Sequence, residues 1–212
     1  MYHFSLATAD LCALPSGALF WPDQSLLVVS DLHFGKSERL ARRGGPLLPP
    51  YETRATLERL DQDIETTSAR CVLCLGDSFD DLAAAEGLDE TDRLWLLRLM
   101  AGREWTWIEG NHDAGPVDLG GSHRSELRHG PLAFRHIATT QNSEISGHYH
   151  PKARLAGRAR RCFLIDPFRV ILPAYGAYTG GLWTHDAAFA MMAPGALAVL
   201  TGATTLPIPM PR

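Results

Sequence analysis

The sequence predicts an α/β fold built on two packed β-sheets with helices on the outside. In the first half of the chain, apolar strand-like runs alternate with helical patterns, which favours a partly parallel sheet. After His136, short strand-like segments separated by Gly and Pro indicate a second, mostly antiparallel sheet. Four clusters of Asp, His and Asn follow strand-like runs, and the interpretation of function depends on them.

The first predicted element is a hairpin with strands over 18–21 and 26–29. The stretch 44–50 has the Gly and Pro content of a loop. Apolar residues at helical spacing predict an amphipathic helix over 52–66. A second helix is expected over 89–101, because acidic residues suit its first turn and a glycine follows its end.

The second half is predicted to contain strands around 153–155, 161–165, 169–172 and 196–200. The Pro-rich tail over 204–212 is predicted to be irregular. No linker or internal repeat divides the chain, so we expect one domain over residues 1–212.

The composition of the chain restricts its expected binding partners and its expected location in the cell. The 212 residues, 45% of them hydrophobic, suit a substantial core. A net charge of −4 gives no overall basic field for nucleic acid, so DNA would have to be held locally. Without a leader-like start or a long apolar run, we expect a cytoplasmic protein with reduced thiols and no membrane partner. Cys71 and Cys74 face opposite sides of a predicted strand, and we interpret both as core residues.

Asp31 and His33 follow the apolar run 26–29, where a predicted strand ends. Residues two apart in an extended segment point the same way, so an oxygen and a nitrogen ligand lie side by side. Ligands of α/β proteins collect beyond the carboxyl ends of strands. Three further clusters follow strand-like runs in the same manner: 76–77 (Gly-Asp), 110–113 (Gly-Asn-His-Asp) and 147–150 (Gly-His-Tyr-His). Together they predict a polynuclear metal site.

This motif series resembles that of the calcineurin-like metallophosphoesterases, over about residues 26–181. A closer resemblance is to the ligase-associated DNA damage response endonucleases, also described as DNA-ligase-associated metallophosphoesterases. It rests on the stretches 31–36 (Asp-Leu-His-Phe-Gly-Lys), 76–79 (Gly-Asp-Ser-Phe) and 172–181 (Leu-Pro-Ala-Tyr-Gly-Ala-Tyr-Thr-Gly-Gly). The resemblance implies a four-layer αββα sandwich of two mixed β-sheets flanked by helices. It also implies a phosphodiesterase or endonuclease of DNA repair, with a DNA ligase and a repair helicase as partners.

The resemblance further implies two divalent metal ions that generate a hydroxide to attack phosphorus. Asp and His ligands suit Mn²⁺, with iron or zinc as alternatives, better than Mg²⁺. One ion would be held by Asp31, His33 and His150, and Asp77 would bridge both. The second ion would take Asn111, His148 and one further histidine.

Two histidines compete for that last position. His129 precedes Gly130, as the family pattern often has it, whereas His136 ends the strand-like run 132–135. The turn expected at 130–131 leaves His129 at the wrong end of that strand, so we favour His136.

The resemblance implies that His112 contacts the phosphate and helps the leaving oxygen depart. A carboxylate that orients a histidine raises its pKa and suits it to act as a general acid. Asp80 has the spacing expected for that carboxylate, with Asp81 as the alternative. Asp113 is expected to orient a ligand or to fix its loop.

Two basic clusters offer candidate contacts for the substrate. Lys36, Arg39 and Arg43 follow the first motif directly, together with Arg42, and we expect the first three to bind substrate. The second cluster comprises Arg154, Arg158, Arg160 and Arg161. Two other functions stay open: a phosphodiesterase or pyrophosphatase for a small nucleotide-type substrate, and a scaffold for repair partners without catalysis.

Overall fold

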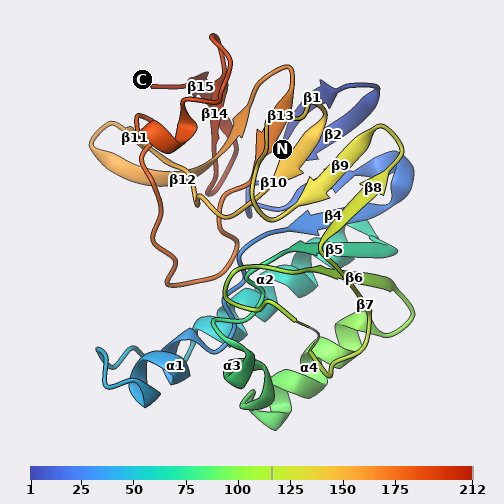
Figure 1. The fold of residues 1–212 in the computed structure, drawn as a ribbon, viewed down its shortest axis with the longest axis vertical. Helices are drawn as coiled ribbons and strands as arrows, with labels where there is room; N and C mark the ends of the chain where they lie inside the picture. The colour runs from blue at the N-terminus through green and yellow to red at the C-terminus, as the bar shows by residue number, and fades with distance from the viewer. Residues whose placement is uncertain (116, 212) are drawn as a thin grey trace.

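The first β-sheet lies in the middle of the molecule in the computed structural model, which describes residues 1–115 and 117–211 (Figure 1). Its seven strands follow the chain order β1 to β7. Neighbours from β1 to β4 pair antiparallel, and neighbours from β4 to β7 pair parallel. The strands are β1 (Tyr2–Leu6), β2 (Ala9–Ala13), β3 (Leu19–Trp21), β4 (Leu26–Val29), β5 (Cys71–Leu75), β6 (Glu104–Ile108) and β7 (Ser122–Arg124). The carboxyl ends of β4, β5 and β6 therefore share one edge.

The second sheet has eight strands, in the order β15-β14-β12-β13-β10-β9-β8 with β11 paired to β12. Its pairs are antiparallel except β10 with β9 and β10 with β13. The strands are β8 (Glu126–His129), β9 (Leu132–Arg135), β10 (Glu144–Ser146), β11 (Lys152–Leu155), β12 (Arg158–Ile165), β13 (Arg169–Ile171), β14 (Leu197–Leu200) and β15 (Leu206–Pro209). The predicted, mostly antiparallel second sheet is thus confirmed.

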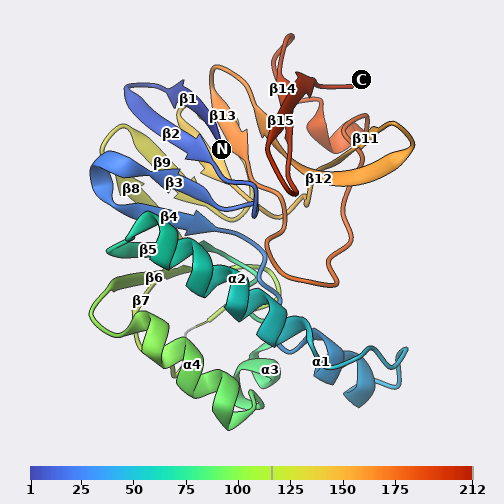
Figure 2. The same ribbon diagram turned by 180° about the vertical axis from the view of Figure 1, so that it is seen from behind.

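Four α-helices lie on the outer side of the first sheet, as both views of the ribbon show (Figures 1 and 2). They are α1 (Lys36–Arg42), α2 (Glu52–Thr67), α3 (Leu82–Glu86) and α4 (Glu90–Met100). α2 packs Leu57, Leu60 and Ile64 against the sheet, at the spacing that predicted this helix. The sheet contributes alternate residues such as Val72 and Cys74 to the same core.

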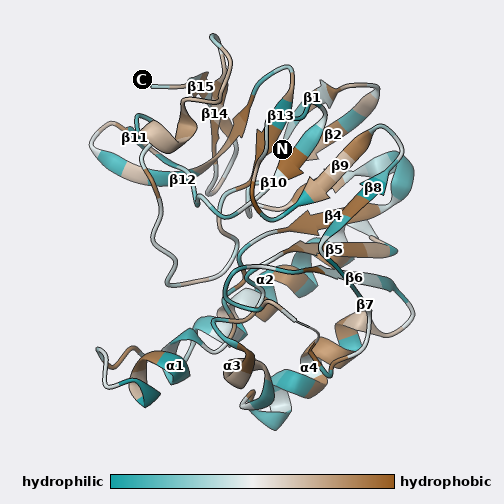
Figure 3. Cartoon of the chain, in the orientation of Figure 1, coloured by the Kyte–Doolittle hydropathy of each residue, from teal (hydrophilic) through white to brown (hydrophobic). Residues whose placement is uncertain are grey.

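A second core lies between the two sheets. Val28, Leu73 and Ile108 of the first sheet pack there with Phe134 and Phe163 of the second. The hydropathy colouring shows β4, which supplies residues to both cores, as a hydrophobic strand (Figure 3). The alternation of side chains explains why adjacent residues of one strand enter different cores.

The outer face of the second sheet is covered by the 3₁₀ turn η2 (Ala187–Phe189) and its flanking loops. Phe189 and Met192 pack there on Cys162 and Ala198. The predicted sandwich of two mixed sheets flanked by helices is confirmed, although all four described α-helices lie on the side of the first sheet. No helix in the described part of the chain is long and apolar enough to cross a membrane.

The hairpin, the loop over 44–50 and both long helices occur where the sequence predicts them. The prediction of an irregular tail was wrong, because 206–209 forms β15; residue 212 lies outside the described part. β15 pairs only with β14, and prolines are tolerated on such an edge strand. Cys71 and Cys74 are free thiols that pack in different cores, as predicted.

Candidate metal centre

The ends of five strands bring the predicted site residues together at one edge of the sandwich. Asp31 and His33 follow β4, Asp77 follows β5, and Asn111 and His112 follow β6. From the second sheet, His136 follows β9, and His148 and His150 follow β10. The loops are joined by backbone hydrogen bonds, such as Asp31 N to Gly76 O at 3.1 Å and Gly147 N to His136 O at 3.0 Å.

Asp31, His33 and His150 form a first group, in which one candidate ligand atom of each lies within 4.8 Å of the others. Asp31 is fully buried, and its Oδ2 accepts hydrogen bonds from Ser30 Oγ at 2.6 Å and from His148 N at 3.0 Å. Its Oδ1 lies 3.1 Å from His150 Nε2. Within the described residues, these two atoms and His33 Nε2 are buried without a partner in hydrogen-bonding geometry. Buried polar atoms are rarely left unpaired, so this arrangement fits a bound cation.

Asp77, His136 and His148 form a second group by the same 4.8 Å measure. The Nδ1–H of His136 donates to Leu75 O at 2.8 Å, which leaves its Nε2 facing the group. Around that Nε2 lie Asn111 Oδ1 at 3.0 Å, His148 Nδ1 at 3.1 Å and Asp77 Oδ2 at 3.4 Å. His136 is thus held by a hydrogen bond at Nδ1, while its Nε2 faces other atoms that carry lone pairs. This arrangement is typical of a histidine that binds a metal ion.

His129 lies outside both groups. It is exposed at the end of β8, where Nε2 lies 2.8 Å from Gln24 Oε1 and the ring meets the edge of Trp21. Of the two competing histidines, His136 is therefore the one that joins the other candidate ligands.

The carboxylate of Asp80 contacts a different histidine from the one that the sequence predicts. Its Oδ1 accepts a hydrogen bond from His33 Nδ1 at 2.7 Å. The Nδ1–H of His112 instead donates to the backbone carbonyl of Asp80 at 3.0 Å. Asp81 caps α3 and pairs with Arg42 and Arg43, so neither carboxylate is bonded to His112. The turn after β5 directs the Asp80 carboxylate across to the first motif, while Asp80 still contacts His112 through its backbone.

The three predicted substrate-binding cations are paired with these same carboxylates. Arg39 Nε contacts Asp80 Oδ2, Lys36 Nζ lies 3.6 Å from Asp80 Oδ1, and Arg43 lies 3.1 Å from Asp81. Burial tends to raise the pKa of Asp80, but its contacts with His33 and Arg39 outweigh burial and hold that pKa far below its usual value. Within the described residues, this basic cluster is largely neutralised.

Asp113 fixes the loops that carry the second group, as one of its two predicted roles requires. It is buried and accepts from four backbone N–H groups, those of residues 77, 78, 79 and 110, at 2.7–3.2 Å. The turn that bears Asp77 is thereby tied to the turn that bears Asn111.

Electrostatic interactions among the candidate ligands shift the pKa values of several of them. Burial tends to raise the pKa of Asp77, but the contact with His136, the His112 N–H and the charge of His33 bring that pKa to about 2. The pKa of His136 is raised because Asp77 and Asp31 outweigh its burial. The pKa of His148 is lowered by burial and by the adjacent His136. The carboxylates thus favour a proton on His136, and that proton disfavours a second one on His148.

The backbone is strained at five of the candidate ligands. Asp31, His33, Asp77, His148 and His150 have φ values of 55°, 48°, 48°, 70° and 48°. A residue other than Gly that adopts a left-handed φ destabilises the fold by on the order of 1–3 kcal/mol, and such residues cluster at functional sites.

Gly147 and Ser30 form a close contact that was not predicted from the sequence. A Cβ on Gly147 would overlap Ser30 Oγ, the hydroxyl that holds Asp31. The feature of the sequence that could have identified Ser30 is its position directly before Asp31, at the end of a predicted strand.

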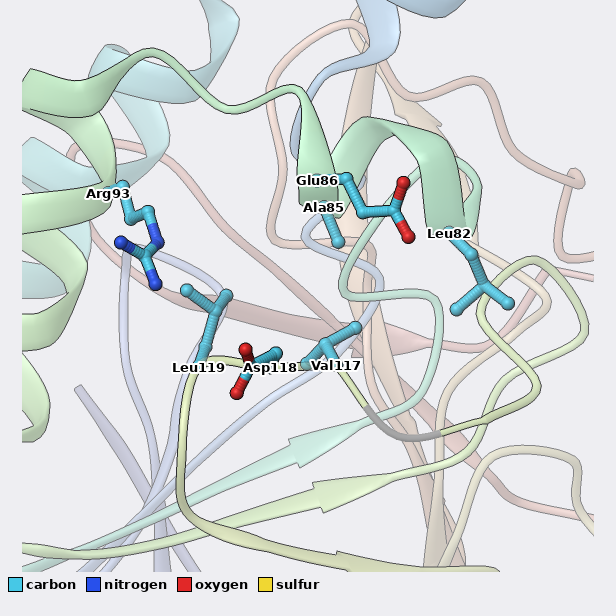
Figure 4. A pocket seen from close by; sticks show the side chains of 7 residues that line it. All are labelled: Leu82, Ala85, Glu86, Arg93, Val117, Asp118 and Leu119. Carbon is cyan, nitrogen blue, oxygen red and sulfur yellow. The ribbon is translucent and has the colours of Figure 1, made fainter.

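A cavity of about 570 Å³ adjoins the second group and is lined in part by Asn111 and His136. Another cavity, of about 480 Å³, lies between α3 and the segment 117–119, whose side chains face each other (Figure 4). None of the candidate ligands lines this second cavity. The chemistry therefore belongs to the strand-end site and its adjoining cavity.

The fold and the paired ligand groups define a metal-dependent phosphoesterase. The family model of the calcineurin-like phosphoesterases matches residues 25–186, and the chain belongs to that family. Among solved structures, the Pseudomonas putida nuclease MPE is similar, with 27% sequence identity and a TM-score of 0.76. The match covers 98% of this chain and 99% of that one, which supports the narrower resemblance as well. The comparison with curated proteins gave no match.

The predicted enzyme class is thus confirmed as a metal-dependent phosphoesterase hydrolase. The family and the clustered ligands support divalent metal ions as its cofactors.

Proposed function

We propose that this protein is a dinuclear-metal phosphodiesterase that cleaves DNA during repair. The observation that carries the proposal is the convergence of Asp31 Oδ1, His33 Nε2 and His150 Nε2, buried and without hydrogen-bond partners, beside a second group of ligands. The similar protein that is named a nuclease matches nearly the whole chain, which supports a nucleic acid as the substrate class.

In this proposal, Asp31, His33 and His150 hold one ion, and Asn111, His136 and His148 hold the other. Asp77 lies against His136, and its backbone carbonyl accepts a hydrogen bond from His33 N at 3.0 Å, a position between the two groups that suits a carboxylate shared by the two ions. When bound, the ions supply a water of lowered pKa and neutralise charge on the reacting phosphate. The mixture of Asp, Asn and His ligands favours Mn²⁺ over Mg²⁺.

His112 has the geometry of a leaving-group acid. Its ring meets that of His33 edge-on, with centroids 5.2 Å apart. Because Nδ1–H is held by the Asp80 carbonyl at 3.0 Å, Nε2 is the nitrogen available to the substrate. In the imidazolium form, Nε2–H donates its proton to the departing ester oxygen.

A small nucleotide-type substrate is the second candidate. The observation that favours it is the pairing of Lys36, Arg39 and Arg43 with Asp80 and Asp81, on a chain whose net charge is −4. A DNA ligase and a repair helicase are proposed partners on the resemblance of the sequence alone.

The two candidates are separated by a substrate panel with the Mn²⁺-loaded protein. Single-stranded DNA, duplex DNA, bis(p-nitrophenyl) phosphate and small cyclic or pyrophosphate nucleotides are compared, with His112→Ala as the control. We expect DNA cleavage, reduced about 10²-fold or more in the variant, since general acid catalysis contributes that much. Hydrolysis of the small substrates without DNA cleavage would replace the first candidate with the second.

A further inference from the structure

Several cations without a carboxylate partner are gathered on the β11–β12 hairpin, whereas those of α1 are paired with Asp80 and Asp81. Residues 151–165 contain five cations and no acidic residue, on a chain of net charge −4. Two of the five serve the fold: Arg160 donates to the carbonyl of Thr201, and Arg161 donates to that of Ala174. The remaining three are Lys152, Arg154 and Arg158.

Lys152 and Arg154 lie on one face of β11, because the intervening Ala153 is buried. Both meet the ring of Trp183: Lys152 Nζ lies 4.6 Å and Arg154 Cζ 5.0 Å from its centroid. In the described part of the chain, no carboxylate lies within ion-pair distance of either cation. Two like charges are therefore held together on an aromatic side chain.

Backbone hydrogen bonds fix Trp183 beside the candidate metal centre. Lys152 N donates to Leu182 O at 2.9 Å, and Thr184 N donates to Lys152 O at 3.1 Å. Leu182 N in turn donates to Tyr149 O, between His148 and His150. The hairpin extends on the same side of the sandwich as α1, at the left in Figure 1 and at the right in Figure 2.

We propose that Lys152, Arg154 and Trp183 form a surface that binds the phosphates of a DNA strand as it leaves the metal centre past His150. This inference rests on the proposed function and deepens it. Lys152 follows His150 by two residues, so their Cα atoms are at most about 7 Å apart. The Cα atoms of Lys152 and Arg154 are about 6.6 Å apart along the strand. A strand of duplex DNA carries one phosphate for about every 3.4 Å of helix axis, so two side chains about 6.6 Å apart reach different phosphates of one strand.

Trp183 gives the surface its geometry. Its ring attracts both cations and holds their side chains in place, although their charges repel each other. Bound phosphates neutralise that repulsion and release counterions, which makes the binding dependent on salt. The neutralised cluster on α1 has less charge to offer for such contacts.

The test measures binding and cleavage separately. The anisotropy of a fluorescein-labelled oligonucleotide, single-stranded or duplex, is followed with the full chain in EDTA at several salt concentrations. The variant is K152A/R154A. The matched control is R70A/R98A, which removes the same charge. Arg70 precedes β5 at the opposite end of the sheet, and Arg98 on α4 pairs with Asp61 on α2. Circular dichroism verifies that both variants are folded, and K152Q/R154Q provides a milder replacement.

We expect K152A/R154A to bind about tenfold or more weakly at low salt, with a salt slope lower by about two, one for each lost phosphate contact. R70A/R98A should remain within about twofold of wild type. Trp183→Ala should weaken binding, and Trp183→Phe should restore most of it. Equal affinity and equal slope in K152A/R154A and wild type would overturn the proposal.

Cleavage by the Mn²⁺-loaded protein distinguishes this inference from the proposed function. If wild type cuts DNA and K152A/R154A cuts it equally well, the surface is wrong and the proposed function stands. If wild type binds DNA through these residues and does not cut it, the surface stands and the proposed function fails.

Discussion

The carboxylate of Asp80 accepts a hydrogen bond from His33 Nδ1 at 2.7 Å, across 47 residues of chain. This contact fixes the tautomer of His33, because Nδ1 carries the proton and Nε2 is left with its lone pair toward Asp31 and His150. Lys36 and Arg39 hold the same carboxylate from α1. One side chain thus couples the helix after the first motif to a candidate metal ligand.

Asp80→Asn should weaken metal binding without preventing folding. The amide is similar in size but loses the charge that orients His33, and such losses lower metal affinity about 10–100-fold. The measurement is the Mn²⁺ concentration that gives half-maximal hydrolysis of bis(p-nitrophenyl) phosphate. Asp81→Asn is the matched control, since Asp81 pairs with Arg42 and Arg43 at the end of α1 and, within the described residues, with no histidine. The same Mn²⁺ requirement in both variants would show that Asp80 does not position His33.

His136→Ala should abolish most of the phosphodiesterase activity, whereas His129→Ala should leave it within about twofold of wild type. His136 Nε2 lies among Asn111, Asp77 and His148, and its loss removes a ligand from the second group. The side chain of His129 meets Gln24 and Trp21 at the surface of the second sheet, away from both ligand groups. Hydrolysis rates and bound manganese are measured for both variants. A large loss in His129→Ala and little change in His136→Ala would show that His129 is the metal ligand instead.

Asp113→Ala should destabilise the fold by at least about 3 kcal/mol, because four buried N–H groups lose their acceptor. The free energy of unfolding in urea is the measurement. Asp186→Ala serves as the control, since Asp186 accepts from a single exposed N–H at the start of η2 and should cost about 1 kcal/mol. Similar losses in both variants would contradict the role assigned to Asp113.

The metal-free protein should lose stability in acid partly through Asp77. The folded pKa of about 2 lies below the ordinary value of 3.8, so the stabilisation is complete above about pH 4. It is lost as the pH falls through the folded value. In EDTA, the free energy of unfolding between pH 4 and pH 3 should therefore fall less steeply for Asp77→Asn than for wild type. Parallel curves for the two proteins would show that Asp77 is not held in its charged form.

The sequence predicted the gathering of Asp31, Asp77 and Asn111 because parallel strands end at one edge, whatever the details of packing. It predicted His136 over His129 from the same strand-end argument. The contact between Asp80 and His33 could not be predicted from the sequence, because this contact depends on how the turn after β5 crosses the turn after β4. Spacing within one motif carries no information on that crossing.

The charge pattern was harder to predict than the ligands. Lys36, Arg39 and Arg43 form a basic cluster in sequence, yet α1 packs them against Asp80 and Asp81. α1 itself was not predicted, because Lys36–Arg42 has few apolar residues to show a helical period. The pairing of Lys152 with Trp183 joins segments that are 31 residues apart and follows only from the strand bridge between them.

The central claim is that two divalent ions held by these side chains perform the hydrolysis. The most direct measurement is a Mn²⁺ titration of the metal-free protein, with bound manganese and hydrolysis of bis(p-nitrophenyl) phosphate followed together for wild type and Asp77→Ala. We predict that wild-type activity appears as two ions bind per chain and that Asp77→Ala loses tight binding and nearly all activity. Full activity in Asp77→Ala, or hydrolysis by wild type without bound metal, would contradict the account.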